Sequence, residues 1–166
     1  MNKISAQAAR LIPYVNRRPQ AAFEAAVALF EDVASVGRSA IYLKHRRDQR
    51  AGTGQYLESL SVRLEDTAID AIELLCALGV EDPAVALAAE YERASEKHPG
   101  MTLDSARHTD ESRFYALAEE AGEVCASLTY DNATQAGHGA SLTSEVTQVG
   151  ALALAWLLRY QDEEVQ

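Results

Sequence analysis

The sequence predicts an all-α protein, a helical bundle formed by residues 1–166 as one domain. Of the 166 residues, 48% are hydrophobic and only 7% are aromatic, and alanine and leucine, both strong helix formers, dominate the apolar set. Apolar residues recur at the three- to four-residue spacing of an amphipathic helix in several long segments. No segment alternates between apolar and polar residues for long enough to demand a β-strand. A chain of this length can bury a substantial core.

The first half of the chain is predicted to begin with a short helix over about residues 5–15, which ends near Pro13. A connector at 17–19 leads to a long helix from Gln20 to about Lys44. The apolar stripe that we expect this helix to bury consists of Phe23, Val27, Phe30, Ala34 and Ile41.

This long helix ends in a basic cluster, residues 44–50, with the sequence Lys-His-Arg-Arg-Asp-Gln-Arg. Cations suit a helix C-terminus, where the backbone carbonyl groups point outward, and we favour this structural interpretation. A phosphate-binding role for the same cluster is the alternative.

Residues 57–78 are predicted to form the next helix, with Gly79 as its C-terminal cap residue. The residues expected to face inward are Leu60, Leu64, Ala68, Ala71, Leu74, Leu75 and Leu78. Asp82 and Pro83 then begin a helix as an N-cap carboxylate and a first-turn proline. That helix is expected to end before the His-Pro-Gly segment at 98–100.

Two further helices are predicted in the last third of the chain, after a polar stretch at 101–110. The first covers about 111–129, and its expected apolar stripe is Phe114, Leu117, Ala121, Cys125 and Leu128. A glycine-containing loop at 130–141, which includes His138, suits either an active-site lid or a simple connector. The last helix runs from about 142 to 160.

Two segments of the sequence resemble each other, and we call this internal similarity the internal echo. Residues 29–36, Leu-Phe-Glu-Asp-Val-Ala-Ser-Val, align with residues 117–124, Leu-Ala-Glu-Glu-Ala-Gly-Glu-Val. Arg63 and Asp66 would then align with Glu145 and Gln148. On this interpretation residues 20–79 are a degenerate copy of a helical hairpin at 111–160, and only the second copy keeps the full acidic set. Chance similarity between two amphipathic helices is the alternative.

Charge and composition exclude several classes of partner. The chain has 25 Asp and Glu residues against 15 Lys and Arg residues, a net charge of −10, so it would repel nucleic acid polymers and anionic membranes. A nucleotide would also be repelled unless a cation bridged it to the carboxylates. The chain start lacks the apolar segment of a secretory signal, and the longest apolar run is about half the length that spans a bilayer, so we expect a cytoplasmic protein. Cys76 and Cys125 lack CxxC spacing and are expected to be reduced core thiols.

Two acidic motifs on successive predicted helices are the candidate functional site. Glu120 and Glu123 are three residues apart and therefore share a helix face, and Glu119 lies beside Glu123 on the next turn. Glu145 and Gln148 repeat the three-residue spacing on the last helix. Carboxylates beside a core face are costly unless they are paired or bind a metal. Two helices that each offer oxygen ligands could hold a hard cation between them.

These motifs resemble those of the MazG-like all-α nucleoside triphosphate pyrophosphohydrolases, which pair an E-E-x-x-E helix with an E-x-x-D helix around magnesium. The matching residues are Glu119-Glu120-Ala121-Gly122-Glu123 and Glu145-Val146-Thr147-Gln148. The flanking segments 91–104 and 146–156 are similar to actinobacterial and phage members, so the resemblance covers about residues 90–160. One departure is Gln148, where most of the family has aspartate.

The resemblance implies that Mg²⁺, or Mn²⁺ in its place, is held by Glu120, Glu123, Glu145 and Gln148. It implies that Glu119 supports these ligands or binds a second ion. Glu119 or Glu120 could also act as general base and orient the attacking water. Just upstream, two further residues are candidates for contacting the phosphates of a nucleoside triphosphate: Lys97 and His98. His98 also suits a structural role before a Pro-Gly turn.

The function that this implies is metal-dependent cleavage of nucleoside triphosphates to monophosphates and pyrophosphate, by a homo-oligomer. Two alternatives belong to other classes. A catalytically silent relative could bind a nucleotide as a sensor, because Gln148 removes one negative charge and weakens magnesium binding. A helical interaction protein could carry its acidic clusters only for solubility, because a solvated face is the usual setting of acidic helix residues.

Overall fold

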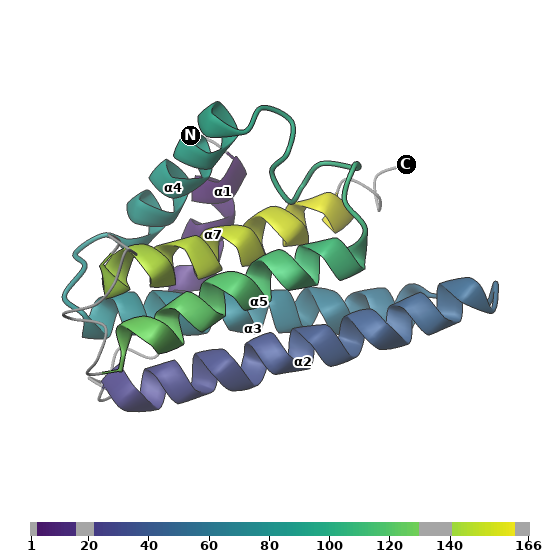
Figure 1. Ribbon diagram of the computed structural model, residues 1–166, viewed down its shortest axis with the longest axis horizontal. Helices are drawn as coiled ribbons and strands as arrows, with labels where there is room; N and C mark the ends of the chain where they lie inside the picture. The colour runs from purple at the N-terminus through teal and green to yellow at the C-terminus, as the bar shows by residue number, and fades with distance from the viewer. Residues whose placement is uncertain (1–2, 16–21, 130–140, 162–166) are drawn as a thin grey trace.

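A computed structural model describes residues 3–15, 22–129 and 141–161 (Figure 1). All regular elements within these ranges are helical, which confirms the predicted all-α class. The elements are α1 (Lys3–Leu11), the 3-10 turn η1 (Ile12–Tyr14), α2 (Ala22–Asp48), α3 (Gly54–Ala77), α4 (Pro83–Lys97), α5 (Asp110–Ser127) and α7 (Leu142–Gln161). The predicted loop at 130–141, with His138, lies almost wholly outside the described residues.

Four helices form a bundle, and two lie outside it. α2 and α3 form a long hairpin, α7 packs along α3, α5 packs along α7, and α5 also contacts α2. α1 and α4 pack on each other and on α7, and each of them also contacts α3 (Figure 1). None of the described helices has the length and apolar character that crossing a membrane requires.

The core is centred on α7, whose residues are buried on nearly all sides from Glu145 to Tyr160. Gly150 shows how closely the neighbouring helices approach it. A Cβ atom added at Gly150 would lie 2.6 Å from Cδ2 of Leu87 on α4 and 3.0 Å from Cβ of Ala71 on α3. Only a hydrogen fits there, so glycine at this position lets three helices meet.

Local sequence chemistry explains where several helices begin and end. The backbone N–H of Val80 donates to the carbonyl of Leu75 at 3.0 Å while Gly79 adopts a φ of 84°, which is the glycine-capped C-terminus predicted for α3. Asp82 accepts a hydrogen bond from the backbone N–H of Val85, as predicted for the N-cap of α4. Thr109 caps α5 in the same way.

The predicted buried stripe of α2 is wrong. Phe23 is 76% exposed and Ile41 is 56% exposed, and Val27 and Ala34 also face outward, while Phe30 is half-buried. The buried face is instead made of small and medium residues, Ala25, Ala26, Leu29, Val33, Val36, Gly37, Ala40 and Leu43. Small side chains allow α2 to approach α3 and α5 closely, so this face takes the core position.

The predicted stripe of α5 is right from Phe114, which is half-buried against the core, to Ala121, and it is wrong at its C-terminal end. Leu117 and Ala121 are buried, but Leu128 and Cys125 are exposed, and Val124 takes the core position instead. Cys76 on α3 is exposed as well, so neither cysteine is the core thiol that we expected. In α3, by contrast, six of the seven residues expected to face inward are buried and the seventh is half-buried.

The two hairpins of the bundle use equivalent positions for burial. Leu29 and Val36 on α2 are fully buried, as are Leu117 and Val124, the residues of α5 that the internal echo aligns with them. This agreement fits a repeat, although any two amphipathic helices of one bundle must bury a face at helical spacing. The repeat therefore stays a prediction.

Candidate metal centre and adjoining cleft

Three carboxylates from two helices converge at one end of the bundle. Each of Glu120, Glu123 and Glu145 offers a carboxylate oxygen, and these three oxygens lie within 4.8 Å of one another. Oxygens that share one Mg²⁺ or Ca²⁺ ion at about 2.0–2.6 Å lie at most about 5 Å apart. The spacing of the three oxygens therefore fits a single hard cation.

Helix geometry explains this convergence. Glu120 and Glu123 are one turn apart on α5, and α5 packs along α7, which brings Glu145 opposite them. Glu145 lies in the first turn of α7, where the positive end of the helix dipole favours a carboxylate. It is only 1% exposed. A charged side chain is rarely so buried without a specific partner.

Glu120 has an unusual environment. Burial, and then the negative charges of Glu123 and Glu145, raise the pKa of Glu120 to about 7. Its Oε2 atom is buried and has no hydrogen-bond partner in the described structure. This buried carboxylate oxygen has no hydrogen-bond donor and lies near two further carboxylates. A cation bound there would coordinate the oxygen and offset the repulsion between the three negative charges.

Gln148 is placed to hold Glu145. Its side-chain Nε2 donates a hydrogen bond to Oε2 of Glu145, with 3.0 Å between the two atoms. Because the amide nitrogen makes this bond, the carbonyl oxygen of Gln148 can still serve as a metal ligand, the role that the resemblance implies. An aspartate at this position could not make the same bond unless it were protonated.

A cleft of about 330 Å³ opens beside these carboxylates, between α4, α5 and α7 and the segment that joins α4 to α5. Glu119, Glu120 and Gln148 line it on one side, and Lys97 and His98 line it on another. The structure thus brings the candidate phosphate-contacting residues to one cavity with Glu119, Glu120 and Gln148, while Glu123 and Glu145 lie outside its lining. Its volume lies within the roughly 300–1,000 Å³ that is usual for small-molecule sites.

Sequence reasoning missed one feature of this cleft. Arg93 on α4 binds Glu90 with two hydrogen bonds, the one from Nε to Oε2 measuring 2.8 Å, and both residues line the cleft. The Arg93 guanidinium side chain is 55% exposed, whereas the Glu90 side chain is only 13% exposed. Arg93 therefore adds a positive charge to the wall that carries Lys97. The three-residue spacing of Glu90 and Arg93 was the available signal, but only the packing of α4 puts the pair beside α5.

A second group of acidic residues lies between α2 and α3. Arg63 binds Asp66 with Nη1 and Oδ2 3.1 Å apart, and the same Nη1 lies 3.9 Å from Oδ1 of Asp32. Burial, and then a hydrogen bond and the charge of Asp32, raise the pKa of Asp70 to about 8. Asp32, Arg63 and Asp66 are the residues that the internal echo aligns with Glu120, Glu145 and Gln148. In this hairpin a guanidinium group supplies the positive charge between the carboxylates.

Fold and site together define a class of protein: an all-α bundle that presents a cluster of three carboxylates beside a ligand-sized cleft. Comparisons with protein-family models, with curated proteins and with solved structures find no match. What the protein does must therefore be argued from the residues themselves.

Proposed function

We propose that the protein is a metal-dependent nucleoside triphosphate pyrophosphohydrolase of the MazG-like kind. The observation that carries the proposal is the convergence of Glu120, Glu123 and the buried Glu145 beside a cleft with cationic residues on its opposite wall. Glu120, Glu123 and Glu145 would hold Mg²⁺, with the carbonyl oxygen of Gln148 as a further ligand. The bound ion would neutralise phosphate charge and polarise the attacking water.

The other residues of the cleft have roles that follow from their charge and position. Lys97 and Arg93 would bind the phosphate oxygens of the substrate, because both are cations on the α4 side of the cleft, where Arg93 also pairs with Glu90. His98 lies next to Lys97 and would bind the same group. Glu119, which is exposed to the cleft, would accept the proton of the water as it attacks. The bond between the α- and β-phosphates breaks, and the products are a nucleoside monophosphate and pyrophosphate.

Charge balance supports a cation in this site. A nucleoside triphosphate carries several negative charges, and the cleft wall already carries Glu90, Glu119 and Glu120. Without a cation, these carboxylates would repel the phosphates. Because the carboxylates come from rigid helices, the site requires little reorganisation when it binds the metal or the substrate.

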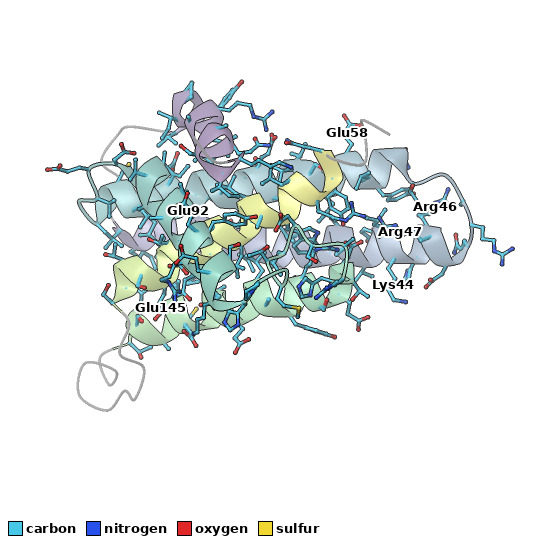
Figure 2. The ribbon with its side chains drawn as sticks, turned by 90° about the horizontal axis from the view of Figure 1, so that it is seen from above. Lys44, Arg46, Arg47, Glu58, Glu92 and Glu145 are labelled. Atoms are coloured by element: carbon cyan, nitrogen blue, oxygen red, sulfur yellow. The ribbon has the colours of Figure 1, made fainter. Side chains whose placement is uncertain are left out.

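The first test is a pyrophosphate-release assay over common and modified ribo- and deoxynucleoside triphosphates, with Mg²⁺, with Mn²⁺ and with chelator. We expect metal-dependent release from a small group of these substrates. Glu123→Ala should abolish turnover while the helical circular dichroism spectrum is unchanged. Glu58→Gln, which removes a carboxylate far from Glu145 (Figure 2), is the matched control and should keep wild-type turnover. Wild-type activity and metal affinity in Glu123→Ala would remove Glu123 from the site.

Gln148 motivates a second candidate function, nucleotide binding without turnover. An amide in place of the usual carboxylate removes one negative charge from the metal centre. A thermal-shift screen with the same nucleotides separates the possibilities. A metal-dependent rise in melting temperature without pyrophosphate release indicates a sensor, whereas no response to metal or nucleotide indicates a purely structural protein.

A further inference from the structure

A second cleft, with a volume of about 690 Å³, lies between the C-terminal half of α2, the start of α5 and the end of α7. Lys44 and Arg47, which line it from α2, lie at the end of the bundle opposite Glu145 (Figure 2). This cleft therefore belongs to a different region of the molecule from the carboxylate cluster. Nothing in the proposed pyrophosphohydrolase function uses its residues.

The charge of this cleft is opposite to that of the chain. Its lining contains four Lys and Arg residues against three carboxylates, while the whole chain has 15 against 25. The cations are Lys44, Arg47, Arg113 and Arg159. On an acidic protein, a concave surface with excess positive charge concentrates anions from solution.

The carboxylate of Asp110 is already engaged within the wall. Its side chain is 7% exposed, and it accepts hydrogen bonds from Arg47, from Arg113 and from the hydroxyl of Tyr160. One carboxylate thus neutralises only one of two guanidinium groups. Arg113 is itself 3% exposed, and its Nε and Nη2 atoms donate to the backbone carbonyls of Leu103 and Ser105. The wall keeps a positive charge that an anion could balance.

Apolar and aromatic side chains also line this cleft, on the same helices as the charged residues. Ile41 is 56% exposed and Tyr115 is 62% exposed, and both line the cleft together with Phe114. The rings of Phe114 and Tyr115 have centroids 6.3 Å apart. The Phe114 ring packs on Gly37, where an added Cβ would approach it to 2.5 Å. A cleft that offers both cations and an exposed ring suits a ligand that has both an anionic group and a ring.

We propose that this cleft binds a small organic anion in which a phosphate or carboxylate group is joined to an aromatic ring. Lys44 and Arg47 contact the anionic group, and Tyr115 packs against the ring. Arg47 stays attached to Asp110, which fixes its guanidinium group at the cleft wall. Lys44 is paired with Asp48 at 3.0 Å and is 56% exposed at its side chain, so it can turn toward a ligand.

The test is calorimetric titration of the metal-free protein with phenyl phosphate, benzoate, inorganic phosphate and phenol. Phenyl phosphate and benzoate distinguish a phosphate from a carboxylate ligand, and the other two probes each lack one half of it. Lys44→Ala and Tyr115→Ala each remove one proposed contact from an exposed position. Lys3→Ala removes an exposed lysine of α1 that lines neither cleft and is the matched control. Circular dichroism checks that each variant remains folded.

We expect phenyl phosphate or benzoate to bind, and to bind more tightly than inorganic phosphate or phenol. Lys44→Ala and Tyr115→Ala should each weaken that binding about fivefold, while Lys3→Ala leaves it unchanged. The proposal is overturned if neither aromatic anion binds at millimolar concentrations. It is also overturned if inorganic phosphate binds as tightly as phenyl phosphate, or if Lys44→Ala and Tyr115→Ala bind like wild type.

Discussion

Gln148 donates a hydrogen bond from Nε2 to Oε2 of Glu145 across 3.0 Å, so the residue that departs from the MazG-like pattern holds the most buried carboxylate of the cluster. The residue at position 148 therefore affects the candidate metal centre in two ways. Any charge that it carries adds to that of the three carboxylates, and its hydrogen bond orients Glu145. Two substitutions of Gln148 test its contribution to metal binding.

We expect Gln148→Asp to tighten Mn²⁺ binding, because it adds a negative charge beside three carboxylates. Gln148→Leu should weaken Mn²⁺ binding about tenfold, because it removes both the hydrogen bond that orients Glu145 and the carbonyl oxygen proposed as a ligand. Isothermal titration at pH 8 measures both affinities. Equal affinities in wild type and Gln148→Leu would show that this bond does not position a ligand.

The pKa of Glu120 predicts how stability depends on pH in the absence of metal. Because this pKa is raised to about 7, the folded state holds the proton more tightly than the unfolded chain. The stabilisation is complete below about pH 4.5 and is lost as pH rises through 7. Glu120→Gln cannot ionise and should remove this loss, so its melting temperature should exceed that of wild type by a few degrees at pH 8.

Thermal unfolding with chelator between pH 5 and 8 measures this difference. Added Mn²⁺ should reverse this difference in melting temperature, since a cation compensates the charge of Glu120 in wild type but meets one carboxylate fewer in the variant. A difference between the two proteins that stays constant from pH 5 to 8 would contradict the assignment of the titration to Glu120.

Two glycines of the bundle predict opposite effects of the same substitution. Gly150→Ala should destabilise the fold by about 1–3 kcal/mol, because the new methyl group would meet Leu87 and Ala71 in a closely packed core. Gly122→Ala should stabilise it by about 1 kcal/mol, because no other side chain lies within 4 Å and alanine favours the helix. Urea unfolding measures both. A stabilising Gly150→Ala would mean that α4 moves away from α7 at little cost.

The buried network around Asp110 predicts a ranking of two variants. Asp110→Ala should cost about 3–5 kcal/mol, because it leaves the buried guanidinium group of Arg113 without its carboxylate. Tyr160→Phe should cost only about 1–2 kcal/mol, because it removes hydrogen bonds to Asp110 and Trp156 but no charge. Chemical denaturation gives both values, and the reverse order would contradict the network.

Local patterns predicted much of the fold, because helix periods and caps are properties of short segments. The Asp82 and Gly79 caps and the inward face of α3 are examples. The face of α2 was wrong because this helix carries apolar residues on two faces. The large side chains at Phe23 and Ile41 suggested the core, whereas close packing against α3 and α5 selected the face with the smaller residues.

The candidate site was also only partly predictable from the sequence. The pairing of Glu120 with Glu123 follows from one turn of helix, and the sequence was sufficient for it. The pair of Glu90 and Arg93 became part of the cleft only through the packing of α4, which spacing along the chain does not reveal. The same holds for the second cleft, whose walls come from three helices distant in sequence. The residues of the basic cluster at 44–50 differ in their contacts. Arg46 lies over the ring of Tyr56, while Lys44 and Arg47 line the second cleft.

The central position of α7 has a consequence for how the protein forms during translation. α7 is the last described helix to leave the ribosome, yet α1, α3, α4 and α5 all pack on it. Until it emerges, the nascent chain has no partner for the faces that these four helices bury against it. The early hairpin of α2 and α3 must therefore wait with exposed apolar surface, a state in which chains depend on chaperones and are prone to aggregate. Ribosome pausing before α7 would prolong that state.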